Sequence, residues 1–271
     1  MVDLPTRVAT FRRLHESGCF VIPNPWDVGS ARLLERLGFP ALATTSSGFA
    51  WTLGRPDYAV AVDEALAHYA AIAGAVKVPI NADFERGFAT DPDGVAKNVA
   101  RACDTGIAGL SIEDSTHETA QPLFDFDVAV ERVRAARRAI DDSGKSLMLT
   151  GRSEGFIVGR PDLRETIRRL EAYAEAGADV LYAPGLSNLD EIRAVVRAVA
   201  PKPVNVLITS GFTTLTELTE LGVRRISVGS ALARTALTGF LAAAREIAEH
   251  GTFNALGSAT PFGEVNRLFN A

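Results

Sequence analysis

The sequence predicts a single (β/α)8 barrel. Short apolar runs alternate with amphipathic helical stretches along the whole chain, and eight such runs fit into 271 residues. The composition shows no break that would mark a second domain. An open doubly wound sheet is the alternative, but the chain reads VGSARL after the first run and lacks the G-x-G-x-x-G turn of a dinucleotide site. Eight strand and helix units in about 250 residues therefore favour the barrel.

The eight apolar runs are the predicted strands. In chain order they are CFVIPN (19–24), ALATTS (41–46), PINADF (79–84), GLSIED (109–114), LMLTGR (147–152), VLYAP (180–184), PVNVLI (203–208) and RISVGS (225–230). Between them lie helical patterns such as DVGSARLLERLG, DEALAHYAAIAGAV, DGVAKNVARACDTG and RETIRRLEAYAEAG. Several end in glycine, as helices do when the last residue turns left-handed. Each predicted helix returns the chain to the start of the next strand.

The single domain, 1–271, ends in a C-terminal extension. The segment TFNALGSATPFGEVNRLFNA, from about 252 to 271, follows the eighth helix and carries Phe253, Phe262 and Phe269. Apolar tails of this kind dock on the barrel or on a partner subunit, so we expect a homo-oligomer, either a dimer or a tetramer.

Charge and hydropathy exclude several classes of protein. The net charge is -5 and the basic residues are scattered, which argues against a nucleic-acid partner. No apolar stretch of about 18 residues or more predicts a membrane span. The N-terminal segment lacks the apolar region and cleavage site of a secretory signal, so we expect a cytoplasmic protein. Only two cysteines, Cys19 and Cys103, are present, which implies neither a disulfide framework nor a zinc site.

Polar side chains gather at the ends of the predicted strands, where barrel enzymes build their active sites. They are Asn81, Asp83 and Glu85 after the third strand, Glu113 and Asp114 after the fourth, Arg152 and Glu154 after the fifth, Asn205 in the seventh, and Ser46, Ser47, Gly48 and Asp57 in the polar loop after the second. Carboxylates from adjacent strands repel one another unless a cation lies between them, and such oxygen ligands suit Mg²⁺ or Mn²⁺. Arg152 would supply a fork for a substrate carboxylate. The substrate is therefore expected to be a small organic acid.

Helix capping is the alternative explanation for a carboxylate at a strand end. Asp27 fits it, as the residue before VGSARLLERL, and Asp91 and Asp125 fit as well. Asp83 and Glu113 fit poorly, because each precedes its helix by several residues. His117 follows the fourth strand in a loop that could cover the site, and it is a candidate acid.

These motifs together resemble the isocitrate lyase and phosphoenolpyruvate mutase superfamily. The similarity runs in order from CFVIPNPWDVGSARLLERLGF through TTSSGFAWTLGRPD, PINADFERGFA, GIAGLSIEDS, LTGRSEGF, AGADVLYAPG and PVNVL to ISVGSALAR. It implies a (β/α)8 barrel, usually a tetramer with the last helix exchanged between paired subunits. It also implies binding of Mg²⁺ and an oxo-acid or enolate, and chemistry at C-C or P-C bonds next to a carboxylate.

The resemblance implies a metal site. On the matching positions, Asp83 and Glu113 would hold the metal, directly or through water. Asn81 stands where family members commonly carry the first Asp of a D-x-D motif. Asparagine still ligates through its carbonyl oxygen, so the site is expected to hold Mg²⁺ more weakly.

The resemblance also implies substrate contacts. Asp57 would lie in the mobile loop at the reacting end, and Arg152 would bind the substrate carboxylate. Ser46, Ser47 and Gly48 would bind the other end of the substrate. Asn205 matches a position that contacts substrate in the lyases.

Two departures from the family pattern narrow the expected activity. The loop after the fourth strand reads EDSTHETAQPLFD and lacks the K-[KR]-C-G-H motif whose cysteine is the acid of isocitrate and methylisocitrate lyases. The mutase has a histidine at the end of its sixth strand, where this chain has Ala183. Neither of those activities by the family route is therefore expected.

The predicted function is a Mg²⁺-dependent carbon-carbon lyase or decarboxylase for a small 2-oxo or 2-hydroxy di- or tricarboxylic acid, acting through a pyruvate-like enolate. A Schiff-base aldolase is set aside, because all four lysines lie in predicted helices or connecting turns. Two alternatives stay open: an enzyme of P-C bonds of the phosphonopyruvate type, and a barrel that binds a dicarboxylate without turning it over.

Overall fold

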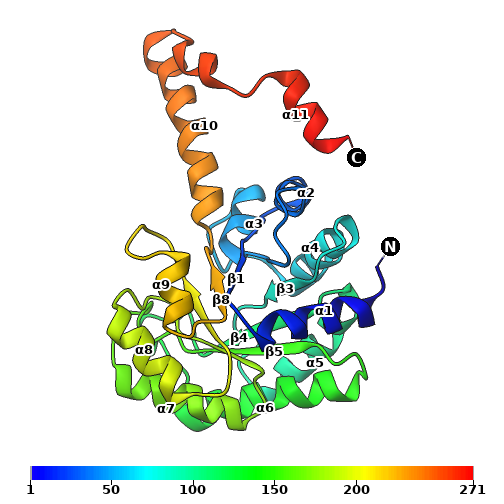
Figure 1. Cartoon of the computed structure of the whole chain (residues 1–271), viewed down its shortest axis with the longest axis vertical. Helices are drawn as coiled ribbons and strands as arrows, with labels where there is room; N and C mark the ends of the chain where they lie inside the picture. Colours follow the sequence, from blue (N-terminus) through cyan, green and yellow to red (C-terminus); the bar gives the residue numbers. More distant parts are fainter. Residues whose placement is uncertain (1, 271) are drawn as a thin grey trace.

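Eight parallel strands form one curved sheet, in a computed structural model that describes residues 2–270. The strands are β1 (Phe20–Ile22), β2 (Leu42–Ala43), β3 (Ile80–Asp83), β4 (Gly109–Glu113), β5 (Met148–Arg152), β6 (Val180–Tyr182), β7 (Val204–Leu207) and β8 (Arg225–Ser227). Each lies inside one of the predicted runs. The order is β1-β8-β7-β6-β5-β4-β3-β2. The two ends of this order meet where the Ala43 N-H donates to the Pro23 carbonyl at 3.1 Å, so the sheet forms the predicted barrel (Figure 1).

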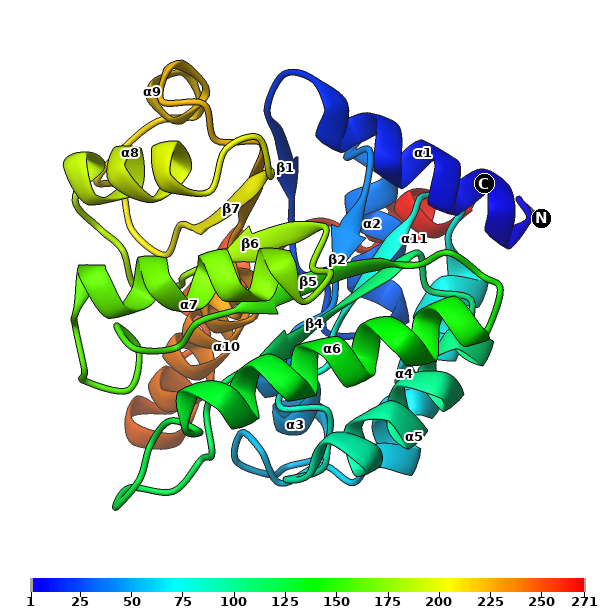
Figure 2. The ribbon, with the colours of Figure 1, turned by 90° about the horizontal axis from the view of Figure 1, so that it is seen from below.

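Helices alternate with the strands, and all but the last of them surround the strands (Figure 2). They are α2 (Val28–Arg36), α4 (Val62–Ala75), α5 (Pro92–Ala102), α6 (Phe126–Asp142), α7 (Leu163–Glu175), α8 (Leu189–Ala198), α9 (Leu215–Glu220) and α10 (Ala231–His250). Four further helices are α1 (Leu4–Glu16), α3 (Ser46–Thr52), α11 (Phe262–Phe269) and the short 3-10 helix η2 (Asn254–Ser258), and another 3-10 turn, η1 (Cys103–Thr105), ends α5. Helix α1 packs Val8 and Phe11 against Phe20 and Met148 at the N-terminal end of the strands.

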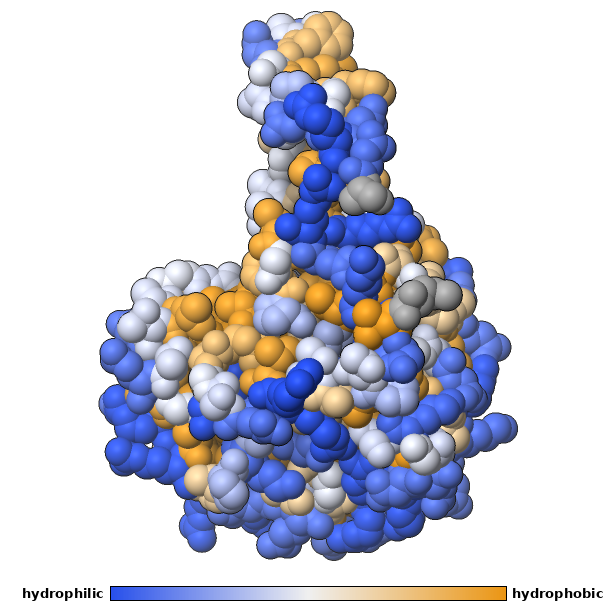
Figure 3. All heavy atoms as spheres, turned by 45° about the vertical axis from the view of Figure 1, so that its right-hand side comes forward, coloured by the Kyte–Doolittle hydropathy of each residue, from blue (hydrophilic) through white to orange (hydrophobic). Residues whose placement is uncertain are grey.

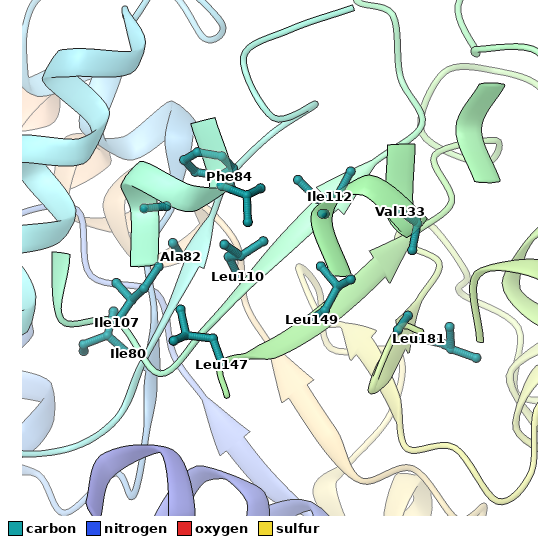
Figure 4. Close-up of a cluster of buried hydrophobic side chains, with 14 of the residues drawn as sticks. Ile80, Ala82, Phe84, Ile107, Leu110, Ile112, Val133, Leu147, Leu149 and Leu181 are labelled. Atoms are coloured by element: carbon teal, nitrogen blue, oxygen red, sulfur yellow. The ribbon is translucent and has the colours of Figure 1, made fainter. Parts of the chain in front are cut away.

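The main hydrophobic core lies between the strands and the surrounding helices (Figure 4). Alternate residues of β3, Ile80 and Ala82, point outward into this core, together with Leu110, Ile112 and Leu149 of the neighbouring strands. Because side chains alternate along a strand, Asn81 and Asp83 point to the inside of the barrel. The packing of the core thus determines which residues face the site.

The eighth helix, α10, leaves the barrel. Ala233 is its one buried residue, and Figure 1 shows the helix rising away from the strands. We call residues 231–270 the arm. At its far end α11 returns to contact α2, where Arg36 Nη1 donates to the Leu268 carbonyl at 3.3 Å. The pattern of strands and helices predicted that the eighth helix packs on the barrel. The chain instead leaves the barrel at Ala231, about twenty residues before the predicted extension begins.

The arm exposes apolar side chains to solvent. Phe240 is 65% exposed, Phe253 63% and Phe262 83%, and Figure 3 shows apolar surface at the tip of the arm and along its length. None of the described helices is long and apolar enough to cross a membrane.

Candidate active site

A cavity of about 210 Å³ opens at the C-terminal ends of the strands. Seven of its lining residues carry the polar groups that the sequence singled out: Ser46, Ser47, Asp57, Asn81, Asp83, Arg152 and Asn205. The barrel therefore brings together residues that lie up to 159 positions apart in the chain. This is the end of the barrel at which such enzymes bind substrate.

Asp83 ends β3 and is held in place by three neighbouring groups. Its Oδ2 accepts from the Ser46 N-H at 3.0 Å, and its Oδ1 accepts from Arg152 Nη1 at 3.1 Å. Its own N-H donates to Thr44 Oγ1 at 2.9 Å. The carboxylate is thus fixed at the edge of the cavity rather than used as a helix cap.

Arg152 ends β5 and lies among three carboxylates. Its Nη1 is 3.1 Å from Asp83 Oδ1 and 3.1 Å from Glu113 Oε2, and its Nε donates to Glu154. Burial alone would lower the pKa of Arg152, but the charges of Glu154 and Glu113 raise it. Nη2 makes no hydrogen bond to any residue between 2 and 270. This one face of the guanidinium is therefore available to a ligand.

Glu85, in the turn that follows β3, belongs to the same cluster. It is 5% exposed, and burial, with the charges of Asp83 and Glu113, raises its pKa to about 9. Burial also raises the pKa of Glu113, as it does that of Asp57, where Asp83 adds to the effect. The cluster thus holds more acidic groups than Arg152 compensates, and an added cation would stabilise their charged forms.

The donor set suits a hard divalent cation. In the part of the chain that the structure describes, no three His, Cys, Asp or Glu side chains surround a single point at metal-binding geometry. Arg152 Nη1 instead lies between Asp83 and Glu113. The nearby carboxylates of Asp83, Glu85 and Glu113 are oxygen ligands of the kind that Mg²⁺ and Mn²⁺ prefer, so the residues present fit such an ion.

Asn81 lies deeper in the barrel than Asp83. The two are two residues apart on the same face of β3, which separates them by about 7 Å along the strand. Asn81 is 4% exposed, its Nδ2 donates to the Ala82 carbonyl at 3.2 Å, and its Oδ1 has no hydrogen-bond partner among the described residues. A Cβ on Gly109 would lie 3.0 Å from that oxygen. The structure therefore places Asn81 on the floor side of the cavity, below the carboxylate cluster.

The loops after β2 and β4 meet above the cluster. His117 Nε2 is 2.7 Å from Glu113 Oε1, and the imidazole stacks on Tyr58 with ring centroids 3.6 Å apart. Both residues have left-handed backbones, with φ of 62° and 63°. Burial and the charge of Arg86 lower the pKa of His117 to about 4. At neutral pH a neutral imidazole thus donates to Glu113, beside Asp57 in the adjoining loop.

Ser46 and Ser47 begin a helix, where the sequence predicted a polar loop. Thr45 is the N-cap of α3, and Ser47 Oγ lies 3.2 Å from Thr45 Oγ1. The Ser46 N-H is used by Asp83. Both serines line the cavity, so their hydroxyls face it while their backbone hydrogen bonds are largely committed to the protein.

Gly48 does not line the cavity. Its N-H donates to Thr45 Oγ1 at 3.4 Å, and an added Cβ would lie 2.7 Å from Thr45 Cγ2 and 2.8 Å from Trp26 Cβ. Close packing under Trp26 therefore accounts for glycine at this position.

Asn205 lies on the inner wall in a polar cluster that the sequence only partly revealed. Its Oδ1 accepts from Arg225 Nε at 2.9 Å and its Nδ2 donates to Ser227 Oγ at 3.0 Å. Arg225 was not identified as a site residue from the sequence, although a charged residue at the start of the apolar run RISVGS indicates a polar position inside the barrel. Glu85 was named among the strand-end residues but not as a metal ligand, and it lies in the turn after β3 with a left-handed φ of 47°, beyond the regular alternation of the strand.

A second group of residues supports the ends of β4 and β5. Asp114 Oδ1 accepts from the Glu154 N-H at 2.7 Å, and its Oδ2 accepts from Arg169 Nη1 at 3.1 Å and from the Tyr173 hydroxyl at 2.6 Å. Helix α7 thereby fixes the backbone that carries Glu154. Asp114 is fully committed to these contacts and supports the cluster from outside the cavity.

Comparisons with known proteins agree with this fold. A family model described as phosphoenolpyruvate phosphomutase matches residues 11–248. The 2-methylisocitrate lyase of Aeropyrum pernix is 27% identical over 248 residues, which cover 86% of this chain and 76% of that protein.

Two crystal structures are similar over almost the whole chain. One, from Burkholderia cenocepacia J2315 and provisionally assigned as a lyase/mutase, is 48% identical with a TM-score of 0.96 and covers 99% of this chain and 98% of its own. The other is oxaloacetate acetylhydrolase in complex with its product oxalate. It is 27% identical with a TM-score of 0.86 and covers 98% of this chain and 93% of its own.

Proposed function

The chain belongs to the isocitrate lyase and phosphoenolpyruvate mutase superfamily of lyases and mutases, and from that membership we propose a Mg²⁺-dependent carbon-carbon lyase or decarboxylase. Its substrate is a small 2-oxo or 2-hydroxy dicarboxylic or tricarboxylic acid. Decarboxylation of oxaloacetate would leave the enolate of pyruvate. Retro-aldol cleavage of a substituted malate would leave pyruvate and the enolate of a second acid.

The observation that carries this proposal is the cluster of Asp83, Glu113 and Arg152 at the ends of three adjacent strands. Two carboxylates and one guanidinium converge on a point at the edge of the cavity. The free Nη2 of Arg152 offers a donor for a substrate carboxylate in a buried site, where charged hydrogen bonds are strong. Asp83, Glu85 and Glu113 would hold the metal ion.

The proposed chemistry needs a stabilised oxyanion and a proton acceptor. When bound, the divalent ion supplies positive charge next to the developing oxyanion, an effect worth roughly 3 kcal/mol per preorganised contact. Arg152 orients the substrate carboxylate. Asp57 lines the cavity, and it is the candidate base that takes the hydroxyl proton of a 2-hydroxy acid. The stacked Tyr58 and His117 would shield the cluster from water once substrate is bound.

The phosphonate alternative has less support from the site. After β6 the chain continues with Ala183, which is 3% exposed and carries no hydrogen-bonding group. A phosphoryl group passing between two atoms needs charged or hydrogen-bonding partners at both ends of its path. A lyase or decarboxylase needs fewer such groups and fits the observed residues better.

Oxalate provides the test, because it mimics the enolate of pyruvate. We expect calorimetry to show oxalate binding that requires Mg²⁺, and we expect release of pyruvate in a screen of oxaloacetate and substituted malates. A chelator should abolish turnover and added Mg²⁺ should restore it. Turnover that persists without metal would contradict the proposal. Binding of intact dicarboxylates alone, without Mg²⁺-dependent oxalate binding, would favour the non-catalytic barrel.

We also infer that the protein is a homo-oligomer held together by the arm. The arm projects from the barrel with Phe240, Phe253 and Phe262 mostly exposed. Beside its base, Trp26, Trp51 and Phe240 line an apolar groove. A second copy of the chain offers both complementary surfaces, so pairing of two copies would bury them.

A further inference from the structure

The floor of the active-site cavity holds a buried guanidinium without an acidic partner. Arg225 is 3% exposed, its Nε donates to Asn205 Oδ1 at 2.9 Å, and its Nη2 donates to Thr150 Oγ1 at 3.1 Å. Its Nη1 is buried and has no hydrogen-bond partner within residues 2–270. No carboxylate of those residues forms an ion pair with it. Arg225 thus retains both an unused donor and an uncompensated charge.

Other deeply buried arginines of this chain face carboxylates or several backbone carbonyls, and Arg132 donates to three carbonyls. Arg152 and Arg169 pair with carboxylates. Arg7 donates to the Ala73 and Val76 carbonyls at the end of α4, where the backbone carries partial negative charge. Arg225 has only an amide and a hydroxyl as acceptors. Burial lowers its pKa to about 10, which leaves it charged at neutral pH. A charge buried in this way is costly unless an anion joins it.

Arg225 faces the same cavity as the catalytic cluster. Ile226 points outward into the hydrophobic core, so Arg225 and Ser227 on either side of it point inward, and both line the cavity. The strand register connects the two ends of the site. On neighbouring strands, Arg152 lies opposite Tyr182, Tyr182 opposite Asn205, and Asn205 opposite Arg225.

This row spans three strand spacings of about 4.8 Å each, so the two arginine Cα atoms lie at most about 14 Å apart along the wall. Both side chains extend from that wall into the barrel. Arg225 Nη2 contacts Thr150 Oγ1, two residues before Arg152 on β5, so the Arg225 guanidinium lies about 7 Å deeper in the barrel than the Arg152 Cα, a depth that a short dicarboxylic acid can span.

We propose that Arg225 binds the distal carboxylate of a dicarboxylate substrate whose reacting carboxylate binds Arg152. The inference rests on the proposed function and adds the residue that selects for chain length. Nη1 would donate to the distal carboxylate, while Asn205 and Thr150 keep the guanidinium oriented. A two-carbon ligand such as oxalate occupies only the Arg152 end, whereas a four-carbon diacid reaches both.

Affinity for ligands of different length tests this role. Calorimetry with Mg²⁺ would compare oxalate with malate for the unmodified protein and for Arg225→Met and Arg225→Lys. We expect Arg225→Met to weaken malate binding about 100-fold, because loss of one partner of a buried charge pair is costly, and to change oxalate binding by less than about threefold. Arg225→Lys, which keeps the charge, should recover part of the malate affinity.

Thr150→Val is the matched control. It removes the neutral acceptor of Nη2 and keeps the charge, so the preference for malate over oxalate should persist. Thermal unfolding would establish that each variant is folded, and Arg225→Met is expected to be no less stable than the unmodified protein, since it removes an uncompensated buried charge.

Three outcomes would overturn the inference. Equal losses for both ligands in Arg225→Met would assign Arg225 a purely structural role through Asn205. Unchanged malate binding would mean that no carboxylate reaches Arg225. A lower unfolding temperature with unchanged length preference would show that its donors are already satisfied. By contrast, an unmodified protein that binds malate but shows no Mg²⁺-dependent oxalate binding would contradict the proposed lyase function and leave the role of Arg225 testable by malate alone.

Discussion

Glu85 and Asn81 lie two residues on either side of Asp83, and the structure gives them opposite surroundings. Glu85 is near enough to Asp83 and Glu113 for their charges to raise its pKa. Asn81 is buried below, with its oxygen next to Gly109. If a motif of two acids separated by one residue holds the metal, Asp83 and Glu85 supply it from this chain. The metal site would then have both carboxylates of such a motif, and Asn81 would not reduce its negative charge.

A pair of substitutions distinguishes these two residues. We expect Glu85→Gln to weaken Mg²⁺ binding at least tenfold, because a carboxylate ligand is lost. We expect Asn81→Asp to leave it within about threefold, because the Cα atom of residue 81 lies about 7 Å deeper along β3 than that of Asp83. Calorimetry with Mg²⁺, or electron paramagnetic resonance with Mn²⁺, would measure both. Tighter binding in Asn81→Asp with no effect of Glu85→Gln would instead make Asn81 the ligand, as the sequence pattern suggested.

At the scale of elements, aspartates before helices show which carboxylates serve structure. Asp27 Oδ1 accepts from the Ser30 N-H at 2.6 Å, and Ser30 Oγ accepts from the Asp27 N-H at 3.1 Å, which together form a capping box at the start of α2. Asp91 likewise caps α5 through the Gly94 N-H. Asp125 occupies the same position before α6, but its side chain makes no capping hydrogen bond.

The caps predict unequal losses of stability. Asp27→Ala should lower the free energy of unfolding by about 1 kcal/mol, the usual cost of losing an N-cap. Asp125→Ala is the matched control and should cost clearly less, because no cap is lost. Urea unfolding followed by circular dichroism would measure both. If both variants lost the same free energy of unfolding, the stabilisation would come from the position of the aspartate before a helix and not from the capping hydrogen bond.

The helix α3 shows where the sequence pattern fails for an element. Seven residues rich in serine and glycine give too little apolar periodicity to predict a helix. The helix forms because Thr45 caps it and because Gly48 and Ala50 pack in the interior. The eight strands, by contrast, were predictable because each is a short apolar run that the barrel buries on both faces.

At the scale of the whole molecule, the arm predicts assembly. We expect the unmodified chain to form a dimer or tetramer in solution, and Phe240→Ser to shift it toward the monomer, because that phenylalanine is 65% exposed on the arm. Val128→Ser is the control, since Val128 is 38% exposed and lies in α6, which is on the side of the barrel away from the arm (Figure 1). Size-exclusion chromatography with light scattering would measure the mass. A monomeric unmodified chain would contradict this prediction.

The barrel, the strand ends that carry the candidate site, and the presence of Asp83, Glu113 and Arg152 at those ends could all be predicted from the amino-acid sequence. These follow from local patterns, because alternating apolar runs and helices specify the order of elements and the residue at each strand end. The sequence also shows that all four lysines lie away from the strand ends, which is the argument against a Schiff-base aldolase.

The way in which those residues face one another depends on the folded barrel. It buried Glu85 beside Asp83, placed Asn81 below them, removed Gly48 from the cavity and brought the unpaired Arg225 to its floor. The physical reason is that depth inside a barrel depends on the stagger between neighbouring strands and on the packing outside them. The charge balance of the cluster likewise depends on distances across strands far apart in the chain, which no local pattern contains.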